Sequence, residues 1–230
     1  MPRLTISIFI FLLSINVLSE EDNYLHPAPS YLDTTFINGT NVTAGILYNI
    51  SAYLFVTPDD YGRMVIIPSF SPPSSIAVYA KYDDKIAEKY NGPWNVPESK
   101  WEYYLTYTVS KEKFGYLPLN KDQVSIQRYD LKISYDLALA IKTAWGEMIE
   151  NHFKRFGEYA TLDGVSYDFS VGNIGEGSTK TPRNGLALEM VNLGKELIEI
   201  TKNQKPLSIH EQTVIIYKFK EFRIKCRPKL

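Results

Sequence analysis

The chain has 230 residues, of which 44% are hydrophobic and 22% charged, and its net charge is −1. This composition excludes a disordered, collagen-like or coiled-coil protein. Its 25 basic residues are matched by 26 acidic ones, so no nucleic-acid partner is expected from the charge of the whole chain. A chain of this length forms one large domain or two small ones. Aromatic residues are the one bias, and 17 of them are Tyr, a residue that suits half-buried strands.

The first residues have the pattern of a secretory signal peptide. Arg3 precedes an apolar run from Leu4 to Leu13, and Val17-Leu18-Ser19 offers small side chains at the −3 and −1 positions of a cleavage site. The run is too short for a membrane span, which needs about 20 apolar residues. We therefore expect residues 1–19 to be removed, no transmembrane segment to remain, and the protein to be secreted or periplasmic.

The cysteine and asparagine residues indicate which covalent modifications a secreted form of the protein could carry. Cys226 is the only cysteine, so the chain forms no internal disulfide and a secreted form must rely on its hydrophobic core. Three N-glycosylation sequons begin at Asn38, Asn41 and Asn49. In a eukaryotic host they would carry sugar, whereas in a bacterium they are polar turn and strand residues.

We expect residues 20–230 to form one domain, with a β-rich first part over residues 46–128. From Ile46 to Val56, apolar side chains occupy every second position, which is typical of a half-buried strand. Segments rich in proline, serine and glycine separate the strands. The expected strands are 46–56, 63–67, 76–82 and 101–109.

Residues 130–204 change to a helical period. Apolar side chains recur every three or four positions from Leu137 to Ile149, and again from Leu186 to Ile200. Thr181 is expected to cap the second helix, with Pro182 as its first residue. Between the helices we expect a strand over 165–171 and then a glycine-rich loop over 172–179.

The final element, residues 212–226, is predicted to be a strand. Ile215, Tyr217 and Phe219 would share one strand face, and a bulge at Lys220-Glu221 would explain the slip in phase after them. The overall prediction is an α+β fold, in which an antiparallel β-sheet packs against two main amphipathic helices.

The sequence predicts no metal site and no cofactor. His26, His152 and His210 are far apart, no pair has the i, i+4 spacing of helical ligands, and no second cysteine is present. The loop 172–179 does not match a phosphate cradle, because Ser178 stands where the P-loop requires lysine.

Carboxylates offer the clearest catalytic chemistry, since two of them in a cleft can hydrolyse a glycosidic bond. Six acidic residues fall between Glu147 and Glu176. They are equally consistent with solvated faces of a helix and a strand. If a catalytic site exists, we place it where the first helix, the following strand and the glycine-rich loop meet. Its candidate residues are Glu147, Tyr167, Asp168, Glu176 and Arg183.

Trp94 is the best candidate for ligand binding. It lies in the loop Asn91-Gly92-Pro93-Trp94-Asn95, where its ring is free to stack on a sugar. Trp101 and Trp145 fall on patterned apolar faces and are expected in the core.

The region from Tyr135 to Ile200 carries a series of short motifs. They are Trp145-x-x-Met148, Leu162-Asp163-Gly164-Val165-x-Tyr167-x-Phe169-Ser170, Gly175-Glu176-Gly177, Pro182-x-x-Gly185 and Met190-Val191-x-Leu193. On these motifs, less than a third of the chain resembles a group of uncharacterised secreted bacterial proteins. That group has an Arg-Tyr pair where this chain has His152-Phe153-Lys154-Arg155-Phe156. The resemblance implies an envelope or secreted location, disfavours glycosylation, and brings no activity or cofactor.

The absence of a catalytic signature favours a non-enzymatic binding protein, secreted or periplasmic, whose partner is a protein or an envelope polymer. An inhibitor or immunity-type protein would fit this hypothesis. The alternative is an envelope hydrolase that acts on glycan or peptide with the carboxylates named above.

Overall fold

A computed structural model describes residues 24–26, 42–56, 61–82, 84–92, 95–115, 119–152 and 164–228. Within these ranges the chain forms a six-stranded antiparallel sheet with the strand order β4-β3-β2-β1-β5-β6. The strands are β1 (Gly62–Pro68), β2 (Ser74–Lys81), β3 (Glu102–Ser110), β4 (Ile126–Ile133), β5 (Val165–Val171) and β6 (Gly175–Lys180). The helices are α2 (Val42–Leu54), α3 (Asp84–Lys89), α4 (Tyr135–Asn151), α5 (Gly185–Lys202) and α6 (Ile209–Cys226). The predicted α+β class is confirmed.

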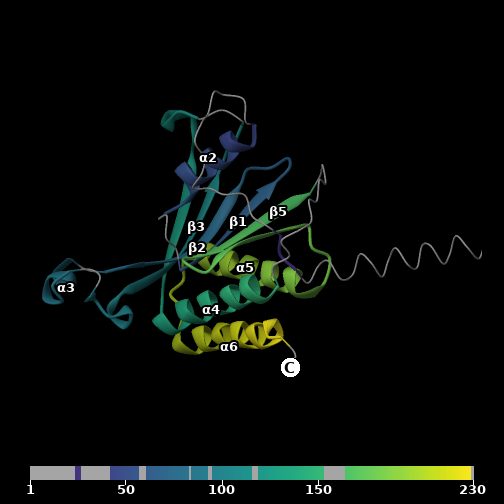
Figure 1. Ribbon diagram of the computed structural model, residues 1–230. Helices are drawn as coiled ribbons and strands as arrows, with labels where there is room; N and C mark the ends of the chain where they lie inside the picture. The colour runs from purple at the N-terminus through teal and green to yellow at the C-terminus, as the bar shows by residue number, and fades with distance from the viewer. Residues whose placement is uncertain are drawn as a thin grey trace, which may run out of the picture.

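The elements form layers (Figure 1). Helices α4 and α5 lie against one face of the sheet, which we call the inner face, and α6 packs on the far side of α4. Helix α2 lies over one end of the opposite face, which we call the outer face. Helix α3 belongs to the connection between β2 and β3 and projects away from the layers.

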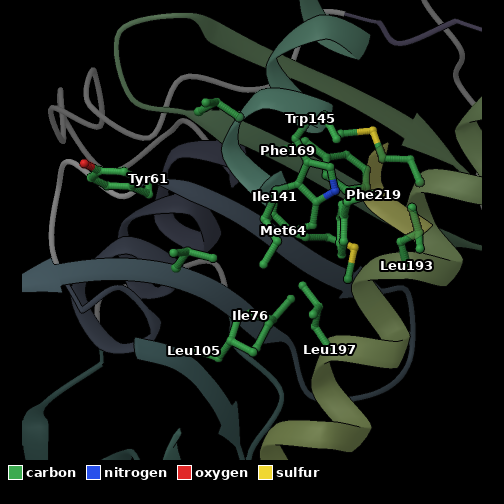
Figure 2. Close-up of a cluster of buried hydrophobic side chains, with 14 of the residues drawn as sticks. Tyr61, Met64, Ile76, Leu105, Ile141, Trp145, Phe169, Leu193, Leu197 and Phe219 are labelled. Atoms are coloured by element: carbon green, nitrogen blue, oxygen red, sulfur yellow. The ribbon is translucent and has the colours of Figure 1, made fainter. Parts of the chain in front are cut away.

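The main core fills the space between the inner face and the helices (Figure 2). Trp145 of α4 is fully buried at its centre, as expected from the sequence. Its ring meets Phe169 of β5 edge-on, with the ring centroids 5.6 Å apart, and Phe219 of α6 in the same manner at 6.4 Å. One aromatic side chain therefore contacts the sheet and the outermost helix.

The prediction of a strand over residues 46–56 is wrong, because most of this segment belongs to α2. Leu47, Ile50 and Leu54 are buried, and their spacing of three and four is that of a helix face. Tyr48, which the strand pattern puts on the same face as Ile50, is exposed instead. Packing of this face onto Val65 of β1 favours the helical period of the sequence over the strand period.

The prediction of a strand over residues 212–226 is also wrong, since the segment is the helix α6 with no bulge. A capping box starts the helix: the Ser208 hydroxyl accepts from the Glu211 N–H, and the Glu211 carboxylate accepts from the Ser208 N–H. The side chains buried against the other helices are Ile215, Phe219, Phe222 and Cys226. Helix α6 therefore adds a further layer outside the two helices that pack on the sheet.

Three ion pairs join α6 to the other helices. Arg223 binds Glu147 of α4 at 2.8 Å, Lys218 binds Glu196 of α5 at 2.5 Å, and Lys225 binds Glu189 of α5 at 2.5 Å. Basic side chains of α6 thus take part in helix packing.

The region around the second helix differs from the prediction in two respects. Most of the expected glycine loop 172–179 belongs to the strand β6, which pairs with β5. Gly177 leaves room for Leu25, since a β-carbon there would lie 2.9 Å from the Leu25 β-carbon. Helix α5 begins at Gly185 rather than Pro182. Thr181 instead takes a φ of 45°, and its hydroxyl oxygen accepts a hydrogen bond from the Val165 N–H at 3.0 Å.

Two substitutions in α6 test whether this segment is a helix or a strand. A strand places Tyr217 and Phe219 on the same face, whereas in the helix Phe219 is buried and the Tyr217 side chain is 63% exposed. Phe219→Ala is expected to lower the free energy of unfolding by about 3–5 kcal/mol, and Tyr217→Ala to change it by less than about 0.5 kcal/mol. Urea unfolding followed by circular dichroism measures both. Equal losses for the two variants would contradict the helix.

Candidate functional site

The outer face of the sheet carries a second, smaller hydrophobic core at the end covered by α2. Leu47, Ile50 and Leu54 pack there on Val65 of β1 and on Phe114, which follows β3. Beyond this core the outer face is polar. It therefore holds the charged side chains that the inner face, packed on helices, cannot accommodate.

A pocket of about 460 Å³ opens beside this small core, and we call it the strand-end pocket. It lies where β1, β5 and β6 reach the same end of the sheet, because Ile67, Ser166 and Lys180 face one another across these strands. The β1–β2 loop forms a second wall, and the segment after β3 forms a third. The apolar lining residues are Ile46, Ile67, Pro68, Pro73 and Phe114.

Asn49 of α2 holds one wall of the pocket in place. Its side chain is fully buried. The amide nitrogen donates to the Gly115 carbonyl at 3.2 Å, and the amide oxygen accepts from the Leu119 N–H at 3.0 Å. The amide of this sequon is thus occupied and inaccessible to a glycan in the folded protein. The sequon residues Asn38 and Asn41 lie outside the described residues.

The polar groups of the strand-end pocket come from four separate segments. Lys113 follows β3, Lys180 ends β6, Ser71 lies in the β1–β2 loop, and Ser166 lies in β5. Ser69 also lines the pocket, but its hydroxyl donates to the Gly164 carbonyl at 2.8 Å. The described lining residues include two lysines and no carboxylate.

An exposed phenylalanine lies in the chain between Ser69 and Ser71, which both line the strand-end pocket. Phe70, in the β1–β2 loop, is 78% exposed. The ammonium nitrogen of Lys113 lies 5.5 Å from the centroid of its ring. This contact places an apolar ring beside a cation that lines the pocket.

Two of the five catalytic candidates lie on the outer face. Asp168 of β5 and Glu176 of β6 lie on neighbouring strands, and Arg63 of β1 shares a row of the sheet with Glu176 and Ser170. Arg63 is buried, with its guanidinium carbon 3.4 Å from the centroid of the Phe55 ring, and Asp168 is only 4% exposed. Burial raises the pKa of Glu176, and the charge of Arg63 opposes that shift.

The other three candidates lie elsewhere. Glu147 is on α4, on the inner side, where Arg223 binds it at 2.8 Å and Arg227 lies at 3.7 Å. Tyr167 is buried on the inner face beneath α5, with the Lys195 ammonium 5.1 Å from its ring. Arg183 is exposed before α5 begins. The sheet therefore separates Glu147 and Tyr167 from Asp168 and Glu176.

The other residues singled out in the sequence are Trp94, His152 and Cys226. Trp94 lies outside the described residues. His152 ends α4, and its Nε2 lies 2.9 Å from the Cys226 carbonyl. Burial raises the pKa of the Cys226 thiol to about 12, so it is protonated and unreactive. In the described part of the chain, no group of three His, Cys, Asp or Glu side chains gathers as metal ligands.

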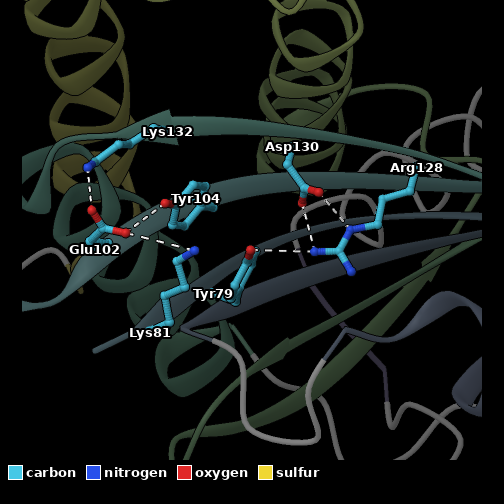
Figure 3. A network of polar contacts seen from close by, with 7 residues as sticks. All are labelled: Tyr79, Lys81, Glu102, Tyr104, Arg128, Asp130 and Lys132. Carbon is cyan, nitrogen blue, oxygen red and sulfur yellow. Dashed lines mark hydrogen bonds and ion pairs between the residues drawn. The ribbon is translucent and has the colours of Figure 1, made fainter. Parts of the chain in front are cut away.

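A network of charged and tyrosine side chains covers the outer face of β2, β3 and β4 (Figure 3). The rings of Tyr79 and Tyr104 stack with their centroids 5.3 Å apart. Lys81 lies 4.5 Å from the Tyr104 ring centroid, and the Arg128 guanidinium carbon lies 5.8 Å from that of Tyr79. Both tyrosine rings are therefore already in contact with a cationic side chain of the same protein.

The carboxylates of this network are paired as well. Lys132 donates to Glu102 at 2.6 Å and so lowers its pKa. Arg128 binds both oxygens of Asp130, at 2.8 and 2.9 Å. Exposed pairs of this kind contribute little to stability individually. The network resembles a solvated sheet surface more than a prepared binding site, because its rings and charges already have partners.

Comparisons with protein families, curated proteins and solved structures found no match to this chain. Among the described residues, no helix is both long and apolar enough to cross a bilayer.

Glu176 is expected to make stability depend on pH. Its pKa in the folded protein lies above the ordinary value of 4.5, so folding favours the protonated form, and stability falls as pH rises from 4.5 through the raised pKa. Glu176→Gln removes this dependence. The variant should therefore have a higher urea midpoint than the wild type at pH 7 and an equal one near pH 4. Glu221→Gln, at an exposed position of α6, is the matched control. A difference that stays constant between pH 4 and 7 would contradict this assignment.

Proposed function

We propose that this chain is a non-enzymatic binding protein, secreted or periplasmic, that holds a small ligand in the strand-end pocket. The pocket itself carries this proposal, because apolar walls and a few polar groups from separate segments converge on a space of about 460 Å³. Ligand sites in proteins typically have volumes of about 300–1,000 Å³ and such a lining. A free small molecule and the end of an envelope polymer would both fit this description.

The geometry gives less support to the hydrolase alternative. Such an enzyme must gather an acid and a base in one accessible cleft. Glu147 is held by arginine on the inner side, and Asp168 is too deeply buried on the outer side to reach a polymer. The strand-end pocket contains no carboxylate among its described lining residues to replace them.

The proposed location rests on the first 19 residues, which lie outside the described residues. If they are a signal peptide, the protein recovered from the periplasm or medium of a Gram-negative host should begin at Glu20, as intact mass spectrometry would show. Replacing Phe9 and Phe11 together by Asp interrupts the apolar run and should leave the chain uncleaved in the cytosol. Recovery of the wild type from the cytosol with Met1 still present would refute the proposal.

Binding in the pocket is testable with two dyes, the neutral Nile red and the anionic anilinonaphthalene sulfonate. At least one should gain fluorescence with the wild type in a saturable manner. Ser166→Phe fills the pocket from the strand side, and Ser71→Trp from the exposed loop. Both variants should lower the dye affinity at least tenfold. Tyr217→Trp, which adds bulk at an exposed helix position, should leave it unchanged. Dye binding that survives both filling variants would count against the pocket.

A further inference from the structure

We propose that the strand-end pocket selects a small anionic amphiphile, a molecule with a carboxylate or phosphate head on an apolar body. This inference rests on the binding function proposed above and specifies its ligand. It follows from how cations, hydroxyls and apolar side chains are distributed over the pocket.

The head group is assigned to the lysine side of the pocket. Lys113 and Lys180 reach it from different segments, and Ser71 and Ser166 add hydroxyls that are able to donate hydrogen bonds. Lysine ammonium groups suit compact anions such as carboxylate and phosphate. Both lysine side chains carry a positive charge, so they attract an anion in the pocket and repel a cationic ligand.

The apolar body is assigned to the side chains of Ile46, Phe114 and Ile67, which adjoin the small core. Ile46 and Phe114 line the pocket there and continue into the small core of the outer face. Ile67 of β1 extends the same apolar surface. A ligand chain in this position is removed from water, which is the principal favourable term for apolar ligands.

Phe70 supports the same orientation. A large aromatic side chain that is 78% exposed gains contact only when something covers it. Its position beside Lys113 suits a molecule whose charged and apolar parts adjoin. We therefore expect the ligand to pass Phe70 with its head between the lysines and its body against α2.

Three ligands with the same ten-carbon tail test the charge preference: decanoate, 1-decanol and decyltrimethylammonium. Isothermal titration of the purified protein below the micelle concentrations gives their affinities. Decanoate is expected to bind at least tenfold more tightly than decanol, and the cation more weakly than either. The decanoate affinity should also fall as ionic strength rises.

Lysine variants locate the head group. Lys113→Ala and Lys180→Ala should each lower the decanoate affinity about tenfold, the loss expected for one hydrogen bond to a charged group, and should leave decanol binding within twofold. Lys111→Ala and Lys121→Ala remove the same charge from exposed positions nearby and should change neither affinity more than twofold. Phe70→Ala should weaken decanoate and decanol equally.

The outcomes separate this inference from the binding function. Equal binding of decanoate and decanol, both abolished by Ser166→Phe, would overturn the anionic class and leave the pocket as a ligand site. Binding of none of the three tails, together with dye binding that survives both filling variants, would overturn the inference and the binding function together. Sedimentation with phosphatidylglycerol vesicles but not phosphatidylcholine vesicles, in the absence of decanoate binding, would overturn the free-ligand form and point to lipid head groups as the source of the anion.

Discussion

The packing of Trp145 sets the distance between the helices and the sheet. Its ring lies beside Gly62 of β1, where a β-carbon would come within 3.1 Å of the indole, and beside Gly194 of α5, where a β-carbon would collide with Met64. The buried indole N–H has no hydrogen-bond partner among the described residues, which costs about 1–3 kcal/mol. The position is therefore held by packing, and the burial of a large aromatic surface offsets that cost.

This one-sided packing explains why the two faces of the sheet differ. Helices α4, α5 and α6 cover the inner face with one continuous core, so the outer face is free to carry polar groups. Helix α2 covers only one end of it. Ligand pockets form where a covered surface meets an open one, because apolar walls and polar side chains then lie next to each other. The strand-end pocket lies at this boundary.

The sequence pattern predicted the α+β class and most of the sheet. It predicted a strand instead of the helix α6 because the spacing of its apolar residues fits the period of a strand as well as that of a helix. Ile215 and Phe219 are four positions apart, which puts them on one face of either a strand or a helix. Tyr217 between them made the strand pattern complete, although it is exposed. The local signal that distinguishes the two is the capping box of Ser208 and Glu211, since only a helix needs such a cap.

The candidate site could not be predicted from residues adjacent in sequence, because strand pairing and loop placement bring Lys113 and Lys180 to the same pocket. One residue nevertheless marks the pocket wall in the sequence. Asn49 stands between the apolar residues Leu47 and Ile50, and a polar side chain on a buried face must find hydrogen-bond partners. Its partners are backbone groups of the segment that also carries Lys113. The asparagine that first indicated a glycosylation site thus helps to tie α2 to the segment that carries Lys113.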